Sequence, residues 1–475
     1  MFDLDQPYPR DMVGYGRTPP RPDWPDGKRL AVQFVVNYEE GGENNILHGD
    51  AASEAFLSEI VGAQPWSGQR HVNMESIYEY GSRVGFWRLW RMFTERGMPV
   101  TVFGVASAMA RHPEAVAAMN EAGWEIATHG LKWIDYRDHT PEAERADLDA
   151  AIGIHEAVTG ARPLGLYQGR TSANTLRLGA QEGGFLYLAD TYADELPYWQ
   201  RIAGRQQLIV PYTLDANDMR FATPQGFNTG DHFFSYLKDS FDVLYREGAG
   251  GHGGMMSVGL HCRLVGRPGR AAALARFLDY VQSHEGAWVT TRLAIARHWV
   301  RRHPPTGGYQ PSQMGPALFN ELFGGVFEHT PIIAERAYGA GIGPGEDSLD
   351  GLHAALVAQM RALSPAAQDA LIAAHPDLAG KLALAGDVTA DSAGEQASAG
   401  LDRLSPDERR RFTALNAAYR ARFGFPFIIA VKGLGKADIL QAFEARIAHA
   451  PTDERDAALA QIERIARLRL AAILG

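Results

Sequence analysis

The sequence predicts an α/β domain followed by an all-α domain, and three observations support this division. Apolar, β-branched segments alternate with helical patterns over the first part of the chain, which is typical of parallel β/α layers, including barrels. All nine tryptophans lie in this part, the last of them at Trp299. Downstream the strand signal almost vanishes, and Ala, Leu, Arg and Glu dominate. A chain of 475 residues is long enough for two or three domains of ordinary size.

The first part begins with a buried strand and continues as alternating helices and strands. The segment LAVQFVVNY (30–38) is mostly apolar, as expected for a strand that is covered on both faces. Apolar residues at helical spacing, followed by a glycine, predict the helix that comes next. The expected elements are then a helix at 83–97, a strand at 99–105, a helix at 112–123, a strand at 124–130 and a later strand at 256–261.

A segment rich in Pro and Gly separates the two parts and has the composition of a linker. We therefore expect domains at 1–303 and 314–475, with the linker at 304–313. The second domain is predicted to be helical throughout. Its expected helices lie at 366–375, at 406–424 with Ser405 as N-cap, at 436–450, and at 452–474 with Thr452 or Asp453 as cap.

Charge and composition exclude several classes of function. The chain has 46 Lys and Arg against 56 Asp and Glu, a net charge of −10, which argues against a nucleic acid or an anionic membrane as partner. A single cysteine, Cys262, excludes a disulfide framework and a cysteine-based zinc site. No apolar run approaches the ~18 residues of a membrane span, and the N-terminus lacks the apolar core of a signal peptide. These features predict a cytoplasmic enzyme that acts on small molecules.

Polar residues that could carry chemistry stand at the ends of predicted strands. Catalytic groups of β/α folds gather at the carboxyl ends of the strands, and Glu39, Glu40, His129 and His261 all occupy such places. Two adjacent carboxylates raise the pKa of one of them, which suits a general base near neutral pH. The alternatives are a solvated turn for the glutamates and structural roles for the histidines. A nucleophilic pair of Cys262 with His261 is disfavoured, because neighbours on a strand point to opposite faces.

The order of these motifs resembles the polysaccharide deacetylase superfamily, which implies an irregular, partly open β/α barrel. The segments that carry the resemblance are NYEEG (37–41), GWEIATH (123–129), Arg162-Pro163 and Leu260-His261. Metal-dependent members have a pair of Asp and two His four residues apart, but here Glu39 and Glu40 replace the Asp pair and Trp133 replaces the second His. A catalytic zinc needs about three protein ligands, and only Glu40 and His129 remain. We therefore expect neither a metal nor another cofactor.

Longer segments narrow this resemblance to the cofactor-independent allantoinases. These segments are ATHGLKWIDY (127–136), YQGRTS (167–172), DTYADELPYW (190–199) and PYTLDANDMR (211–220). The resemblance implies hydrolysis of the hydantoin ring of allantoin to allantoate, with Glu39 or Glu40 as base and His129 or His261 as acid or oxyanion donor. The other residues expected to bind the substrate are Arg170, Asp215 and Asn217. Trp133 would form a wall of the pocket. An alternative for 215–218 is a turn capped by its own Asp and Asn side chains.

In the second domain two sites stand out, although the residues alone favour structural roles. His375 ends a predicted helix next to Pro376, where it could interact with the helix dipole. Ser392 and Glu395 have the spacing of a capping box. Over residues 314–475, however, the chain resembles the 2-oxo-4-hydroxy-4-carboxy-5-ureidoimidazoline (OHCU) decarboxylases. The segments that carry this resemblance are LFNELFGGVFEHTP (318–331), AHPDLAG (374–380) and RFGFPF (422–427).

This second resemblance implies an all-helical, cofactor-free and usually dimeric enzyme. His375 and Glu395 would be catalytic, with Glu395 orienting the imidazole ring. The substrate contacts would come from Pro376, Ser392, Gln396, the backbone of Phe427, Ile428, Ile429, Ala430 and Val431, and Arg469. Together the two resemblances predict a bifunctional enzyme of urate breakdown, in which OHCU is decarboxylated to (S)-allantoin and allantoin is hydrolysed to allantoate.

We expect a homo-oligomer, dimeric or tetrameric, whose other partners are its small-molecule substrates. The alternative is a metal-dependent deacetylase or amidohydrolase that carries the helical domain as a non-catalytic oligomerisation or sensing module. A stoichiometric zinc ion would favour this alternative.

Overall fold

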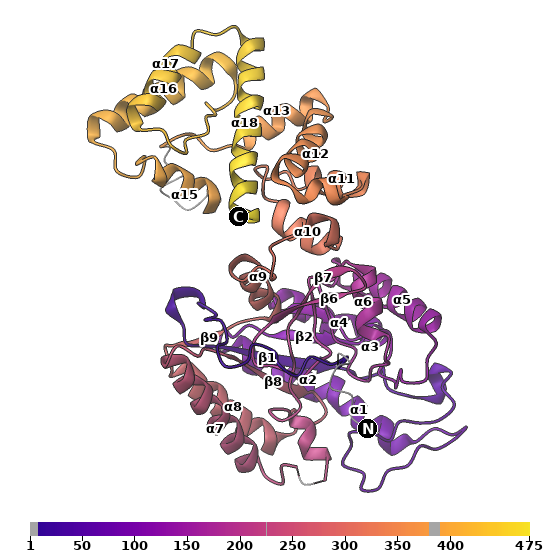
Figure 1. Cartoon of the computed structure of the whole chain (residues 1–475). Coiled ribbons are helices and arrows are strands. Elements are labelled where there is room, and N and C mark those ends of the chain that lie inside the picture. The colour runs from indigo at the N-terminus through magenta and orange to yellow at the C-terminus, as the bar shows by residue number, and fades with distance from the viewer. Residues whose placement is uncertain (1–7, 225, 380–389) are drawn as a thin grey trace. The chain divides into compact units, whose positions relative to one another are not determined.

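The structure, a computed structural model, describes residues 8–224, 226–379 and 390–475 (Figure 1). The chain forms two compact units, Met1–Pro305 and Thr306–Gly475, and the division falls inside the segment expected to be a linker. Within the described residues, no helix is long and apolar enough to cross a membrane.

The N-terminal unit is built on one nine-stranded sheet. The strand order is β6-β7-β5-β4-β3-β2-β1-β8, and β9 pairs with β1. All pairings are parallel except the one between β6 and β7. The path ends at β6 on one side and β8 on the other, so the expected partly open β/α barrel is confirmed. The strands are β1 (Leu30–Tyr38), β2 (Thr101–Gly104), β3 (Glu125–Thr128), β4 (Gly165–Leu166), β5 (Tyr187–Leu188), β6 (Tyr198–Ile202), β7 (Arg205–Ile209), β8 (Met255–His261) and β9 (Ala287–Val289).

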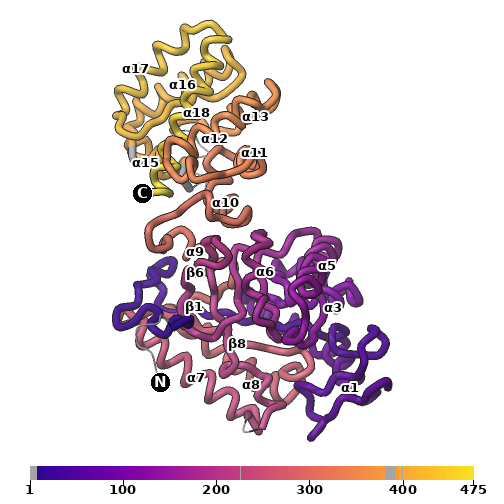
Figure 2. The backbone as a smooth tube through the Cα atoms, turned by 45° about the vertical axis from the view of Figure 1, so that its right-hand side comes forward, coloured from indigo at the N-terminus to yellow at the C-terminus, as the bar shows by residue number. Residues whose placement is uncertain are grey.

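Helices follow the strands and cover the sheet, as the trace in Figure 2 shows. Strand β1 is buried over its full length, and the helices pack apolar residues such as Phe93 and Phe277 against Phe34 of this strand. The helices of this unit are α1 (Val72–Tyr80), α2 (Phe86–Thr94), α3 (Ala106–Arg111), α4 (Pro113–Glu121), α5 (Pro141–Thr159), α6 (Thr175–Glu182), α7 (Gly230–Ala249), α8 (Pro268–Gln282) and α9 (Arg292–Arg302).

The helix expected at 83–97 starts earlier than predicted and contains a widened turn. Helix α1 continues through a five-residue π-helical turn, η3 (Gly81–Gly85), into α2. A β-carbon at Gly85 would overlap the carbonyl oxygen of Cys262. Glycine therefore allows this turn to lie directly against the chain segment that follows β8, which is where the functional site forms.

The described residues of the C-terminal unit form helices and connecting turns. Ser405 caps α16 together with Glu408, and Gly424 ends this helix in the left-handed region, as predicted. The expected cap at Thr452 or Asp453 is wrong, because the last helix starts at Pro451 after Ala450. The helices are α10 (Pro316–Phe323), α11 (Ile332–Ala340), α12 (Leu349–Arg361), α13 (Pro365–Ala374), α15 (Ala390–Ser398), α16 (Pro406–Phe423), α17 (Lys436–Arg446) and α18 (Pro451–Leu474).

Candidate active sites

Three side chains at the ends of neighbouring strands meet in the N-terminal unit. Asn37 of β1 lies opposite His261 of β8, and the amide of His129 donates to the carbonyl of Gly104 at the end of β2. The Nε2 atoms of His129 and His261 lie 3.5 and 3.4 Å from Oε1 of Glu39. All three side chains are buried. The parallel sheet explains this convergence, because the carboxyl ends of its strands share one edge.

A fourth residue, Arg263, places a buried cation against Glu39. Its Nη1 lies 2.6 Å from Oε2 of Glu39, and the residue is fully excluded from solvent. The guanidinium lies over the rings of Tyr78 and Trp133, 4.4 and 5.0 Å from their centroids, an arrangement that suits a planar cation. Arg263 was not among the residues expected from the sequence. The sequence feature that could have indicated it is its position, two residues after a histidine at a strand end, in an otherwise apolar segment.

The surrounding charges shift the pKa values of Glu39 and His261 in opposite directions. Burial raises the pKa of Glu39, but Arg263 and His261 outweigh it and hold that pKa well below its usual value. Nδ1 of His261 donates to Oδ1 of Asp218 at 2.6 Å. Burial lowers the pKa of His261, yet the charges of Glu39 and Asp218 raise it to about 9. At neutral pH the site therefore combines an ionised carboxylate with an imidazolium.

Glu40 turns away from the histidines. Its carboxylate accepts the backbone amides of Arg263 and Glu39 at 3.1 and 3.2 Å, and burial raises its pKa to about 7. A β-carbon at Gly81 would overlap this carboxylate, so glycine makes room for it. The sequence left open which of the two glutamates meets the histidines. Glu39 does, because successive side chains at a strand end point to opposite sides.

Trp133 and Arg170 lie beside this cluster. The indole of Trp133 contacts the guanidinium of Arg263, described above, and that of Arg170, which is 5.1 Å from its centroid. Phe56 stacks on Trp133 with a centroid distance of 5.8 Å. The Arg170 guanidinium also pairs with the buried Glu54 at 3.3 Å. These contacts join the segment around residues 54–56 to the strand-end cluster.

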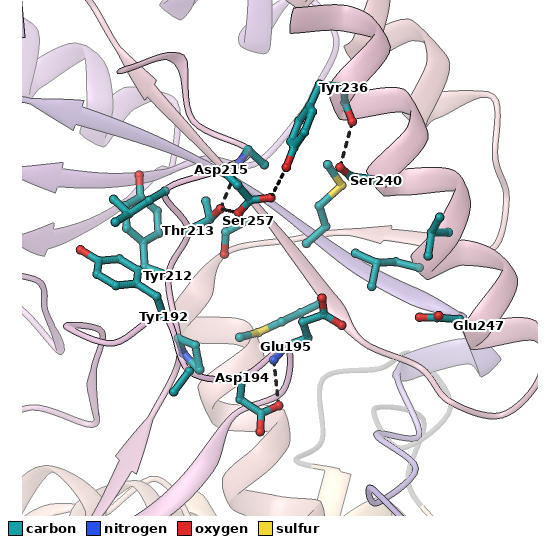
Figure 3. A pocket seen from close by; sticks show the side chains of 18 of the residues that line it. Tyr192, Asp194, Glu195, Tyr212, Thr213, Asp215, Tyr236, Ser240, Glu247 and Ser257 are labelled. Carbon is teal, nitrogen blue, oxygen red and sulfur yellow. Dashed lines mark hydrogen bonds between the residues drawn. The ribbon is translucent and has the colours of Figure 1, made fainter. Parts of the chain in front are cut away.

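The structure moves two expected substrate contacts, Asp215 and Asn217, away from the cluster. Asp215 accepts hydrogen bonds from Thr213 and Tyr236 and lines a separate cavity of about 1110 Å³, where Figure 3 shows it pointing toward the tyrosine hydroxyl. Asn217 caps a 3-10 turn by accepting the amide of Met219. The turn interpretation of this segment therefore describes both residues.

Asp218, which the sequence analysis did not single out, is the residue of this turn that reaches His261. Its Oδ2 accepts the backbone amides of His261 and Val265 at 2.7 and 2.9 Å, while Oδ1 receives Nδ1 of the ring. The side chain is fully buried. A carboxylate in this position fixes the tautomer and the orientation of the imidazole.

The residues around Glu39 do not fit the divalent metal ion that a resemblance to metal-dependent deacetylases would imply. Across the described ranges, no three His, Cys, Asp or Glu side chains are grouped so that they could hold a metal ion. Trp133 provides no ligand atom, and Oε2 of Glu39 is already paired with the guanidinium of Arg263. A second cation at this carboxylate would be repelled by the guanidinium of Arg263, and the repulsion would be strong because both side chains are buried.

In the C-terminal unit, His375 ends α13 and lines a narrow cleft. The residue before a proline prefers extended backbone, and His375 adopts it as the C-cap before Pro376. Its Nδ1 donates to the carbonyl oxygen of Leu371 at 2.9 Å, which leaves Nε2 as the basic nitrogen. Burial lowers the pKa of the ring. The lining of the cleft is His375, Pro376, Leu378, Ser392, Glu395, Gln396, Phe427, Ile428, Ile429, Val431, Ile465 and Arg469.

Nearly all residues expected at the second site thus line one cleft. Ala430 is the exception, and its amide donates to the side chain of Gln461 at 3.0 Å. Gln396 accepts the amide of Ala379, and the carbonyl of Ile428 accepts a hydrogen bond from Arg446. Several of the backbone and side-chain groups expected to touch substrate therefore also stabilise the walls of the cleft.

Arg469 is held by two carboxylates at this cleft. Its Nε and Nη2 donate to Glu395 at 2.9 and 3.2 Å, and its Nη1 donates to Glu328 at 3.0 Å. Ser392 also donates to Glu328 and lies inside α15, so the capping-box interpretation is wrong. The expected role of Glu395 in fixing the tautomer of His375 is wrong as well, because the Leu371 carbonyl does so. Glu328, fully buried, was not expected from the sequence.

Comparisons with known proteins divide the chain in the same way. The polysaccharide deacetylase family model matches residues 74–182, and the OHCU decarboxylase family model matches residues 312–471. A crystal structure described as Puue allantoinase is 57% identical and covers 63% of this chain and 99% of its own, with a TM-score of 0.62. A polysaccharide deacetylase-like protein of Schizosaccharomyces pombe is 41% identical over 314 residues, which are 62% of this chain and 98% of that protein. The 2-oxo-4-hydroxy-4-carboxy-5-ureidoimidazoline decarboxylase of Amia calva is 37% identical over 156 residues, which are 33% of this chain and 87% of that protein.

The C-terminal site lies within residues 312–471, and His129, Trp133 and Arg170 of the N-terminal site lie within residues 74–182. The chain therefore belongs to the polysaccharide deacetylase family in its N-terminal part and to the OHCU decarboxylase family in its C-terminal part.

Proposed function

We propose that the chain is a bifunctional enzyme of urate breakdown. The C-terminal domain decarboxylates OHCU to (S)-allantoin, and the N-terminal domain hydrolyses the hydantoin ring of allantoin to allantoate. One observation carries this proposal: a domain that is 57% identical to a protein described as an allantoinase is fused to an OHCU decarboxylase domain. The product of the second domain is the substrate of the first.

In the hydrolase site, Glu39 and His261 divide the proton transfers. Glu39 is ionised and accepts a proton from the attacking water, whose oxygen bonds to the ring carbonyl carbon. His261, protonated at neutral pH, gives its proton to the ring nitrogen as the carbon–nitrogen bond breaks. His129 contacts the same oxygen of Glu39 as His261 does and helps to position the carboxylate. Arg170 and Trp133 form the nearby surface that receives the ureido group.

In the decarboxylase site, His375 and Arg469 have the principal roles. Arg469 anchors an anionic group of OHCU, and the narrow cleft holds the scissile carboxylate out of the plane of the ring. Loss of CO2 leaves an electron pair that the imidazoline ring and its carbonyl delocalise. Nε2 of the neutral His375 takes the proton of the substrate hydroxyl group and returns it to one face of that carbanion, which makes (S)-allantoin, and water supplies the proton that neutralises the product. Glu395 positions Arg469 through two hydrogen bonds, while Pro376, Ser392, Gln396 and the chain at 427–431 shape the cleft.

We further propose that the protein is a cytoplasmic homo-oligomer that acts on these two small molecules. The net charge of −10 supports small-molecule substrates over nucleic acid or anionic membrane. The oligomeric state is measurable by sedimentation of the full chain.

The test is to supply OHCU to the purified full-length protein and to follow CO2, allantoin and allantoate together. We expect CO2 release first, transient (S)-allantoin, and then allantoate. Unaccelerated OHCU decay would refute the decarboxylase assignment, and persistent allantoin would refute the hydrolase assignment. Metal analysis of the same sample tests the alternative of a metal-dependent deacetylase. Stoichiometric zinc, together with activity that is lost on chelation, would support that alternative.

A further inference from the structure

Several buried polar atoms in and beside the Glu39 cluster have no hydrogen-bond partner within the part of the chain that the structure describes. Nη2 of Arg263, Nδ1 of His129, Nε2 of Gln168 and the hydroxyl of Tyr78 have no hydrogen-bond partner among the described residues. All four atoms are inaccessible to solvent. A buried polar group without a partner is destabilising, so such a group at a site indicates a ligand that pairs with it.

Arg263 is the charged member of this group, and its other contacts fix where Nη2 lies. Nη1 pairs with Glu39 at 2.6 Å, and Nε lies 3.4 Å from the carbonyl oxygen of Leu57. The aromatic faces of Tyr78 and Trp133 hold the plane of the guanidinium. Nε and Nη1 therefore contact the protein on two different edges of the guanidinium group, and Nη2, which lies between them, is the donor that remains for a substrate oxygen.

We infer that Arg263 supplies, in this hydrolase, the positive charge that a metal ion supplies in metal-dependent deacetylases. Nη1 compensates the charge of Glu39, and Nη2 donates to the carbonyl oxygen that becomes negative when water attacks. This inference rests on the proposed hydrolysis of allantoin and names a further catalytic residue for it. It also accounts for the poor fit of a metal at this carboxylate.

The step is balanced without any further reactant. The water oxygen bonds to the ring carbonyl carbon, its proton moves to Glu39, and the carbonyl electron pair moves onto the oxygen that faces Nη2. When this oxyanion collapses, the carbon–nitrogen bond breaks and the nitrogen takes the proton of His261. Glu39 then returns its proton to His261, and the new carboxylic acid ionises to allantoate. A fixed, desolvated donor aimed at the oxyanion stabilises the transition state more than the ground state.

The decisive variant is Arg263→Lys, which retains the positive charge but lacks the second donor of the fork. We expect kcat for allantoin hydrolysis to fall by about 10²–10³-fold, as for the loss of one oxyanion donor, with a much smaller change in KM. Arg276→Gln is the matched control, because Arg276 is an exposed arginine paired with Asp231 on the surface. It should leave both constants unchanged. Circular dichroism and thermal melting compare the folding of all three proteins.

Arg263→Ala allows a second measurement, chemical rescue by guanidinium, which would have no effect if Arg263 had only a structural role. Guanidinium at millimolar concentration, far below denaturing levels, should restore part of the lost activity, whereas equal concentrations of sodium or urea should not. A wild-type kcat in Arg263→Lys, or rescue by sodium equal to that by guanidinium, would overturn the inference while the hydrolase assignment stands. If the alanine variant fails to fold, the lysine variant decides alone. A wild-type protein that does not hydrolyse allantoin would remove the proposed function, and the inference with it.

Discussion

Replacing Asp218 with Asn tests whether the imidazolium of His261 is the acid of the hydrolase. Asn has nearly the same shape, and its oxygen can still accept the amides of His261 and Val265 that Oδ2 accepts now. Its NH2 group, however, would face Nδ1 of His261 in place of the carboxylate oxygen that lies there at 2.6 Å. The ring would lose both the acceptor and the negative charge that favour its protonated form.

The expected loss follows from the pKa of about 9 that Glu39 and Asp218 give to His261 against the effect of burial. At about pH 8 roughly nine-tenths of the ring is then protonated, but only about 3% would be if the pKa returned to its ordinary value near 6.5. Because Glu39 still faces the ring in this variant, protonation alone predicts a fall in kcat/KM of at most about 30-fold. The wrong tautomer of His261 would lower kcat/KM further, by up to about 10⁴-fold in total.

The assay is allantoate release by the full-length protein across the neutral and alkaline pH range. In the wild type, kcat/KM should decline as pH rises through about 9, because the raised pKa belongs to the form that must be protonated. In Asp218→Asn this decline should move to lower pH. Asp231→Asn, an exposed carboxylate at the start of α7, is the control. An Asp218→Asn enzyme with wild-type kcat/KM and an unmoved alkaline limb would refute the reasoning.

Three further predictions concern the second site and the support of the first. His375→Gln should reduce OHCU decarboxylation by about 10²–10⁴-fold, and the circular dichroism signal of (S)-allantoin should disappear because the remaining product is racemic; optically active product at the wild-type rate would contradict this. Because burial lowers the pKa of His375, the decarboxylase kcat/KM should stay level as pH falls to 6.5 and decline only below it, as the neutral base becomes protonated; a decline that begins above neutrality in the pH–rate profile would contradict this. Gly81→Ala should lower the free energy of unfolding by about 1–3 kcal/mol in urea, since the new β-carbon would overlap the carboxylate of Glu40; an unchanged urea midpoint would show that this site can relax.

The features that depend on strand ends could be predicted from the sequence. Strand β1 has the predicted bounds, because a continuous apolar run between polar ends leaves little choice of where it is buried. Once parallel strands are predicted, the approach of Glu39, His129 and His261 follows, since each directly ends or follows a strand. In the helical domain the residues alone favoured structural roles, and only the family resemblance predicted that His375 and Arg469 belong to one site; both line the same cleft.

The remaining site residues depend on contacts that no local pattern encodes. Asp218 reaches His261 across 43 positions, and which carboxylate of the segment 215–218 turns inward is decided by the turn that Asn217 caps. Arg263 lies in the tight turn after β8, where side-chain direction follows neither the strand nor the helix period. Glu328 meets Arg469 from 141 positions away. Each of these partners is set by the tertiary packing of distant segments.

The π-helical turn at Gly81–Gly85 makes the length of this segment as important as its composition. Each residue advances an α-helix by about 100°, so removing one residue here would rotate everything after it by that angle. Phe86, Leu89 and Phe93, which α2 buries, would then swing toward solvent. Substitutions by small side chains on the outer surface should be tolerated, but insertions or deletions should not. The number of residues between the positions of His71 and Trp87 can therefore indicate which related sequences retain this helix geometry.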